Sequence, residues 1–398
     1  MLALAHKALI AVVTWLPMIS VIVMIHELGH FSVARAFGVS IDRFSLGFGK
    51  AIAAWRDKHG TEWRIGWIPL GGYVRFGGDE NAASVPDRDD LAALRRQIIE
   101  REGPGGERKY FAFKPLWQRA LVVVAGPVAN FILAIVLFSI VSLAFGDVLF
   151  PPKVSMVVPA SAADQAGFKA GDVVLKADST SIDSFNDLNS YVVLRAGTPI
   201  SFLVQRGAQR LTLMATPRET YVDQYHSKIG RLGVAGAPGR RVKLNPLQAL
   251  GSGVRQTWDI VDLTGTYLGR LVTGHASADM LSGPLGTLQL SGTVATEAAN
   301  SATALPEQAL AVLVSLSQLA GMISVSLGFM NLLPVPVLDG GHLLFYVVEA
   351  ITRRPLAASI QMASYRVGLA LLLGLMLFAT TNDLLRINAF HFLGGLFS

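Results

Sequence analysis

The chain has 398 residues, of which 52% are hydrophobic and only 16% are charged, and its mean hydropathy is +0.46. Soluble domains carry about 25% charged residues, so this composition disfavours an ordinary soluble protein and indicates a membrane protein. The net charge of +6 suits anionic lipid headgroups, and without a nucleic-acid motif we expect no nucleic-acid partner. Cysteine is absent, so any metal must be held by nitrogen and oxygen donors.

Four apolar stretches are long enough to cross a bilayer: 8–25, 120–145, 309–333 and 367–380, the last extending to 385. Fifteen Lys and Arg residues lie between 35 and 119, whereas the longer 146–307 segment has fourteen. The positive-inside rule therefore predicts that the 35–119 and 352–366 loops are cytoplasmic, with both termini and the 146–307 segment outside. The first stretch exceeds the usual length of a signal-peptide core and is expected to remain as a span.

This first stretch ends in the motif His26-Glu27-Leu28-Gly29-His30. Residues four apart share one face of a helix, so both imidazoles can bind one zinc ion while Glu27 takes a proton from a water molecule at the metal. The alternative is a pair of helical histidines with ordinary hydrogen bonds. Ionisable residues at membrane depth are costly and usually functional, which favours the metal site and peptide hydrolysis within or beside the lipid.

Zinc at such a site needs a third protein ligand. Val33 and Ala36 stand where a metzincin would have its glycine and third histidine, so the ligand lies elsewhere. Asp339 is best placed, because it follows the apolar run 332–338, where a lone carboxylate would be costly at membrane depth. It could instead cap a helix that begins near Gly340. The other candidates for the third ligand are Asp42, His59, Glu62, His342 and Glu349.

The same run contains two prolines that interrupt the helix. Non-helical backbone at membrane depth is tolerated only beside protein or a water-lined cavity, and a catalytic chamber provides both. We therefore expect Pro334 and Pro336 beside a bound substrate. Asn331 could be a plain helix terminator, or a donor that holds substrate backbone or an oxyanion near the metal.

The 37–118 segment is predicted to contain a cytoplasmic β region that rests on the membrane. Residues 62–67 and 73–76 flank a Gly-rich turn and indicate two strands, and 44–49 is similarly strand-like. Trp63, Ile65 and Trp67 would share one face, and an exposed strand edge could hold the backbone of an unwound substrate helix. Residues 79–106 are expected to form a loose surface segment with a short helix near 89–101.

The outer segment shows short strands and turns between 154 and 218. We expect a small helix near 162–166, a strand at 173–175, a helix at 187–194, and paired strands at 200–204 and 211–213 around Gly207. The pattern resembles a PDZ domain with circularly permuted strand order, at 150–240, although a generic small β-rich domain fits too. Apolar residues between 247 and 271 recur at helical spacing, which predicts an amphipathic or ordinary packed helix within a 244–307 linker segment.

Three motifs occur in order: the histidine motif, Gly126-Pro127-Val128-Ala129-Asn130, and the run from Asn331 to Gly340. Together they resemble the site-2 protease family of intramembrane zinc metalloproteases (peptidase M50), most closely the bacterial type that regulates sigma-E. The resemblance covers essentially the whole chain. It implies one zinc ion bound by His26, His30 and Asp339, Glu27 as the catalytic base, and Asn331 near the metal. Gly126, Pro127 and Asn130 would be structural residues of the core.

The expected fold is therefore an α-helical integral membrane protein with helices at 1–36, 119–146, 308–351 (broken before Asp339) and 366–386. The cytoplasmic β sheet and one periplasmic PDZ domain complete it. The resemblance implies a bacterial inner-membrane enzyme that cleaves transmembrane segments of single-pass proteins, such as anti-sigma factors or signal-peptide remnants, after a first cut by a site-1 protease. Well-known members of the family have two tandem PDZ domains, whereas the outer segment of this chain has room for only one. The resemblance therefore does not imply how this protein selects its substrates.

Two other classes of protein fit parts of the sequence. A metal transporter could also place histidine and carboxylate ligands among membrane helices, but it would need no PDZ domain. A membrane scaffold could use a PDZ domain for recruitment alone, but it would need no Glu27 between two ligand histidines.

Overall fold

The computed structural model describes residues 2–78, 88–222, 227–276, 278, 281–354 and 356–386. The chain divides into two compact units, one formed by residues 1–138 and 283–381 and the other by 139–282 and 382–398. Helices α3 (Leu116–Phe145) and α10 (Ala358–Arg386) contribute residues to both.

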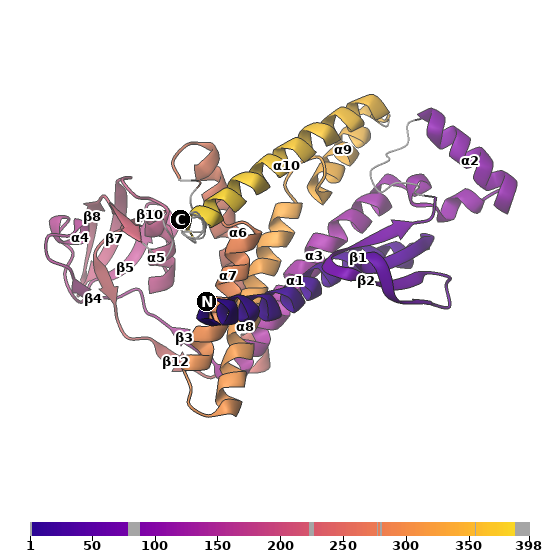
Figure 1. The fold of residues 1–398 in the computed structure, drawn as a ribbon. Coiled ribbons are helices and arrows are strands. Elements are labelled where there is room, and N and C mark those ends of the chain that lie inside the picture. The colour runs from indigo at the N-terminus through magenta and orange to yellow at the C-terminus, as the bar shows by residue number, and fades with distance from the viewer. Residues whose placement is uncertain are drawn as a thin grey trace, which may run out of the picture. The chain divides into compact units, whose positions relative to one another are not determined.

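The first unit is built mainly from helices, among them α1 (Leu2–Ala36), α8 (Leu305–Asn331) and α9 (Asp339–Thr352) (Figure 1). Within the described residues, four helical segments are long and apolar enough to cross a membrane: His6–Ala36, Leu116–Phe145, Leu305–Asn331 and Ser359–Leu385. These are the four spans that the sequence predicts. The third span ends at Asn331, and a short loop separates it from α9, so the predicted break before Asp339 is present.

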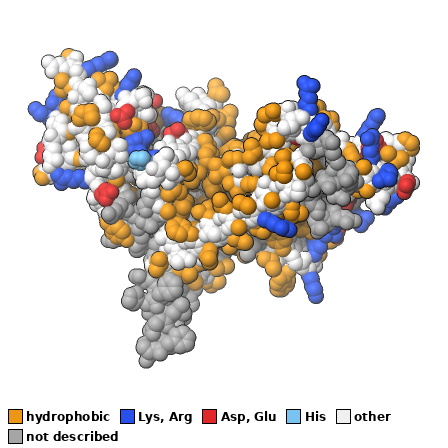
Figure 2. All heavy atoms as spheres, turned by 90° about the horizontal axis from the view of Figure 1, so that it is seen from above, with side chains coloured by type: hydrophobic (Ala, Val, Ile, Leu, Met, Phe, Trp, Pro, Cys, Tyr) orange, Lys and Arg blue, Asp and Glu red, His pale blue; other side chains and the backbone are white. Residues whose placement is uncertain are grey.

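Many large apolar side chains on these helices are exposed. Leu9 and Val13 of α1 are each 61% exposed and Leu377 of α10 is 70% exposed. Hydrophobic side chains gather in a broad patch on the face shown in Figure 2. A soluble monomer rarely exposes a large continuous apolar patch, whereas lipid covers one favourably. This surface therefore supports insertion of the helices in a bilayer.

Helix α7 (Pro284–Asn300) packs on α1 and α8. Gly292 permits the approach, because a Cβ there would lie only 2.8 Å from the Cβ of Ala11. Trp15 Nε1 donates a hydrogen bond to Thr287 Oγ1 at 3.0 Å. Small residues and side-chain hydrogen bonds are the usual means of helix association in membranes. The sequence predicts only a linker in this stretch, because its small and polar residues show no apolar period.

Strands β1 (Ile41–Arg56) and β2 (Glu62–Phe76) fold back on themselves into four paired segments. Residues 43–46 of β1 lie in the middle, paired with 62–65 on one side and with 72–75 on the other, and residues 51–56 pair with 62–66. Gly47 and Gly49, with φ of 85° and 84°, form the bend in β1. The two predicted strands are present, but β1 separates them, so they do not pair with each other.

The sheet packs on the end of α1 that carries the histidine motif. Phe31 of α1 meets Phe44 and Trp63, with ring centroids 5.3 Å and 5.0 Å away, in a buried cluster. Arg35 Nη2 lies 2.6 Å from Asp57 Oδ2 in the turn between the strands. Trp63 is thus a packing residue, whereas Trp67 is 72% exposed, and the expectation of one shared exposed face is wrong for Trp63. Packing on Phe31 decides the orientation of Trp63, and strand alternation alone does not predict that packing.

Helix α2 (Arg88–Glu102) lies where the sequence predicts a short helix at 89–101. The rest of the predicted loose segment includes residues 79–87, which lie outside the described part of the chain. Two short 3₁₀ helices, Gly106–Lys109 and Phe111–Phe113, lead into α3. Lys114 Nζ donates to the Phe37 carbonyl at 2.6 Å and so fixes the start of α3 beside the end of α1.

The second unit contains a small α+β domain. Its main sheet is antiparallel, with the order β6 (Thr180–Ser181), β5 (Val173–Ala177), β7 (Ile200–Arg206) and β8 (Gln209–Ala215). Strand β4 (Val154–Val157) pairs with β11 (Val234–Gly236), β9 (Arg218–Val222) with β10 (Ser227–Arg231), and β3 (Asp147–Leu149) with β12 (Arg240–Val242). Helices α4 (Ala162–Gln165) and α5 (Phe185–Val193) and the β7–β8 hairpin lie at the positions that the sequence predicts.

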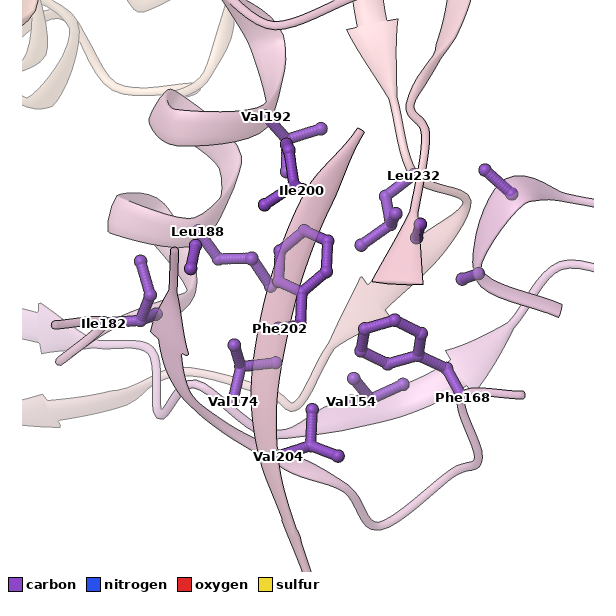
Figure 3. Close-up of a cluster of buried hydrophobic side chains, with 14 residues drawn as sticks. Val154, Phe168, Val174, Ile182, Leu188, Val192, Ile200, Phe202, Val204 and Leu232 are labelled. Carbon is purple, nitrogen blue, oxygen red and sulfur yellow. The ribbon is translucent and has the colours of Figure 1, made fainter. Parts of the chain in front are cut away.

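This domain has its own core. Val154, Phe168, Leu188 and Phe202 are among the side chains that converge between the main sheet and α5 (Figure 3). The core residues all lie between 154 and 232. A core closed within one continuous segment supports independent folding.

Helix α6 (Pro246–Val272) follows this domain and is amphipathic. Asn245 caps it, and small residues such as Ala249 and Gly253 are buried. Leu247 and Trp258 are 78% and 67% exposed. The helix therefore has one packed face and a separate exposed apolar stripe, and it occupies the residues at which the apolar spacing predicts a helix.

Candidate metal centre

Two histidines from α1 and one carboxylate from α9 meet inside the first unit. His26 Nε2 and His30 Nε2 lie 3.2 Å apart, and Asp339 Oδ2 lies 3.2 Å from the first and 3.5 Å from the second. His26 is buried, and the other two side chains are largely enclosed. The helical four-residue spacing brings the imidazoles together, as the sequence predicts, and the tertiary fold adds the carboxylate.

Asp339 reaches this position because the chain breaks between α8 and α9. Gly340 and Gly341 are buried, and a Cβ on Gly340 would overlap the Leu332 and Leu333 carbonyl oxygens. Asp339 is the first residue of α9, but the N-cap position is Leu338, and no side chain of the described residues caps this helix. The capping interpretation of Asp339 is therefore wrong, because its carboxylate points to the histidines instead of to the helix amides.

Helix α3 forms the wall behind the histidines. A Cβ on Gly126 would overlap His30 Nε2 and would lie 2.9 Å from His26 Cε1, and a Cβ on Gly29 would overlap the Ala125 carbonyl. The two helices can therefore touch only because each carries a glycine at the crossing. Pro127 lies one position further along α3, where its carbonyl oxygen would be 3.0 Å from a Cβ on Gly328 of α8.

Hydrogen bonds to α3 fix the orientation of the two imidazoles. His30 Nδ1 lies 2.8 Å from the Val122 carbonyl, which accepts a hydrogen bond from the Nδ1–H group, and the Nε2 lone pair is left free. His26 Nδ1 lies 3.2 Å from the Asn130 side-chain amide, whose Oδ1 is buried without a hydrogen-bond partner among the described residues. Rotating this amide by half a turn lets Oδ1 accept a hydrogen bond from the His26 Nδ1–H group, so that Nε2 of His26 is free as well.

This donor set fits a divalent metal ion such as zinc. Asp339 Oδ2 is buried and receives no well-aligned hydrogen bond from the described residues, so an acceptor is left without a proton or a cation. Zinc bonds of about 2.0–2.2 Å in tetrahedral geometry place neighbouring ligand atoms about 3.3 Å apart. The three observed separations of 3.2, 3.2 and 3.5 Å match this spacing.

Glu27, a residue of α1, lies beside this centre and faces β2. A Cβ on Gly72 would lie 3.2 Å from Glu27 Cγ, and the backbone of Val74 makes a hydrogen bond to the Glu27 carboxyl. The segment 72–74 is an outer segment of the sheet. Sequence reasoning singled out Trp63, Ile65 and Trp67 for this region and missed Gly72 and Val74, because only the folding of β2 beside α1 brings them to Glu27.

The other predicted residues are distributed as follows. Asn331, the last residue of α8, places Nδ2 3.3 Å from His26 Nε2, so it faces the centre instead of merely ending a helix. Pro336 packs on α10, since a Cβ on Gly368 would overlap its carbonyl oxygen, and Pro334 is exposed. Among the alternative ligands, Glu62 pairs with Arg43 and Glu349 with Arg119, while Asp42, His59 and His342 are not part of the described cluster.

These features define a membrane protein with a buried centre for a divalent metal ion. Comparison with known proteins agrees: residues 14–375 match the model of peptidase family M50. The chain is 49% identical to the metalloprotease MmpA of Caulobacter vibrioides, over 98% of this chain and 99% of that protein. It is 39% identical to candidate zinc metalloproteases of Agrobacterium fabrum and Rhizobium meliloti, each over more than nine-tenths of both chains.

The chain therefore belongs to peptidase family M50 and is a membrane metalloprotease of the site-2 type. The match covers both the histidine motif and the Asp339 segment, the two parts of the sequence that build the centre.

Proposed function

We propose that this protein is an intramembrane zinc endopeptidase that cleaves the transmembrane segments of single-pass membrane proteins. The observation that carries the proposal is the convergence of His26, His30 and Asp339 beside Glu27, within helices that are apolar enough to lie in a bilayer. The zinc metalloprotease names of several relatives support the choice of metal.

The ligands of the single zinc ion would be Nε2 of His26, Nε2 of His30 and Oδ2 of Asp339. When bound, zinc supplies a Lewis acid that polarises a carbonyl group and makes water more acidic. Glu27 removes a proton from the attacking water and delivers it to the departing amine. The Asn331 amide, already directed at this centre, donates to substrate backbone or to the developing oxyanion.

A helical substrate hides its amide groups in internal hydrogen bonds and must unwind before it is cut. We assign capture of the unwound backbone to the sheet, whose outer segment 72–74 lies beside Glu27, with the exposed Ile65 and Trp67 contacting substrate. Pro334 and Pro336 would border the same path. A photo-crosslinking residue at position 67 should then attach to substrate, and its failure to do so would remove this surface from the pathway.

The proposed setting is a bacterial inner membrane, with both termini and the α+β domain in the periplasm and the metal centre near the cytoplasmic side. The α+β domain would act as a single PDZ module that binds a substrate segment or another peptide. Substrates would be anti-sigma-factor-like proteins or signal-peptide remnants, shortened first by a site-1 protease. The basic 35–119 segment and the strand order of the domain support these assignments.

The decisive experiment is Glu27→Gln in the full-length protein, reconstituted in liposomes with a single-span substrate. We expect zinc to remain at one equivalent and cleavage to fall roughly a thousandfold, because the general base is lost while the ligands remain. Glu297→Gln, which alters an exposed carboxylate of α7, is the matched control and should cleave normally. Undiminished cleavage by Glu27→Gln would remove Glu27 from its role.

The metal-transporter alternative makes the opposite prediction. A transporter would move zinc across the liposome membrane and leave the substrate intact, and Glu27→Gln would not be selectively defective in proteolysis. Cleavage without zinc movement decides for the endopeptidase.

A further inference from the structure

The helix that supplies Asp339 is held near both of its ends. Its first turn lies at the metal centre, where Gly340 and Gly341 are its buried residues. Val347 and Ile351, further along, are 54% and 77% exposed. Between them, Glu349 Oε1 lies 2.6 Å from Nη2 of Arg119, in the first turn of α3. Helix α9 therefore also contacts α3 through Glu349, away from the ligand Asp339.

This ion pair is not an ordinary surface contact. The side chains of Arg119 and Glu349 are only 18% and 23% exposed. The Arg119 guanidinium also lies 4.9 Å from the ring centroid of Tyr346, one turn before Glu349 on the same helix. Removing one partner of an enclosed pair leaves the other charge unpaired, which costs more than the loss of an exposed pair.

The pair joins α9, which carries Asp339, to α3, which forms the wall behind the two histidines of α1. At 1.5 Å per residue, the ten residues from Asp339 to Glu349 span about 15 Å of α9, and the seven from Arg119 to Gly126 span about 10 Å of α3. Val122, one turn after Arg119, accepts the hydrogen bond of His30. A single rigid stretch of α3 thus both orients a histidine and holds the helix that carries the carboxylate.

The connection between α8 and α9 is a loop and not a continuous helix. Residues 332–338 form turns and one isolated bridge, between Pro336 and Leu338. A loop of this kind can absorb a change in helix direction.

We propose that the Arg119–Glu349 pair, with Tyr346, positions Asp339 against His26 and His30 and thereby sets the affinity and geometry of the metal centre. This inference rests on the proposed function, since it assigns these residues to the zinc site. Arg119 and Glu349 are positioning residues that touch neither metal nor substrate. Glu349, one of the candidate ligands in the sequence, would act on the metal only through α9.

The first test measures zinc affinity of the purified full-length protein in detergent, by competition with a chromophoric chelator. Arg119→Ala, Glu349→Ala and the double variant should each bind zinc about tenfold more weakly, because the pair acts as a unit. Arg119→Lys, which keeps the charge, should recover most of the affinity. Arg43→Ala breaks the pair with Glu62, whose side chains are 28% and 26% exposed, and is the matched control that should bind normally.

Unchanged zinc affinity in the single variants, or an equal loss in Arg43→Ala, would overturn the proposal. A hundredfold loss in the double variant would also contradict it, because additive effects mean that the two residues act separately.

A second test needs no zinc. The chain has no cysteine, so spin labels can be attached through Leu121→Cys on α3 and Val347→Cys on α9, both at exposed positions. In metal-free protein we expect one narrow distance distribution, which Arg119→Ala broadens or shifts. An unchanged distribution would refute the positioning role. If the unaltered protein binds no zinc, the proposed function fails, while this measurement still decides whether the pair holds α9.

Discussion

The imidazole of His30 fits against α3 only because Gly126 has no side chain. A Cβ on Gly126 would overlap His30 Nε2, the atom proposed to bind zinc. His30 cannot rotate away freely, because its Nδ1 is hydrogen-bonded to the Val122 carbonyl. The geometry of the metal centre therefore depends on Gly126 as well as on the three ligands.

The corresponding prediction is that Gly126→Ala displaces His30 by several tenths of an ångström or more. We expect turnover to fall roughly 100-fold, as a misplacement of about 1 Å does in other enzymes, with a parallel loss of bound zinc. Zinc content and cleavage of a single-span substrate measure this. Gly374→Ala on α10 is the control and should behave as the unaltered protein, because its Cβ would meet no atom of the described part of the chain within 4 Å. Equal zinc content and activity in both variants would refute the steric argument.

At the scale of elements, the α+β domain offers a stability test. Asp172 is fully buried, and Arg206 holds its carboxylate through Nε and Nη2 at 2.7 and 2.8 Å. Burial by itself would raise the pKa of Asp172, but hydrogen bonds from Arg206 and from the Lys169 amide lower it below its ordinary value. The charged form is therefore the one that stabilises the fold.

We expect the segment 147–242 to fold alone and Asp172→Asn to destabilise it by about 2 kcal/mol near pH 7, which lowers its melting temperature by about 10 °C. A carboxyl whose pKa is lower in the folded state stabilises above its unfolded pKa of about 3.9, and this contribution is lost as the pH falls through the folded pKa. The difference between the two proteins should therefore vanish in strong acid. Thermal unfolding by circular dichroism at neutral pH and at a series of progressively more acidic pH values provides the measurement. A difference that persisted or grew in acid would contradict the assignment.

At the scale of the whole molecule, the arrangement across the membrane is open to a direct test, again because the chain has no cysteine. Arg96 on α2 and Arg210 on β8 are both exposed. The positive-inside rule places the first in the cytoplasm and the second outside. In cells with a permeabilised outer membrane, an impermeant maleimide should label Arg210→Cys at once and Arg96→Cys only after lysis. The reverse pattern would invert the proposed topology.

Much of this organisation is written locally in the sequence. The four spans follow from apolar runs, and the pairing of His26 with His30 follows from the helical repeat. The β7–β8 hairpin around Gly207 follows from strand alternation and turn chemistry. In each case, neighbours within about ten residues carry the information, because hydrogen-bond period and hydrophobic burial act over that distance.

Other features were decided only by the tertiary structure. Trp63 packs on Phe31 and not with Trp67, α7 forms in a stretch without apolar period, and Gly72 lies beside Glu27. Asp339 was the best candidate for the third ligand among several, and the 3.2 Å approach to His26 distinguished it from Glu62 and Glu349, which are paired with arginines. The amino-acid sequence determined the membrane class and the local motifs, whereas the crossing of α1, α3 and α9 decided which distant groups meet, because contacts far apart in the chain depend on packing and not on local spacing.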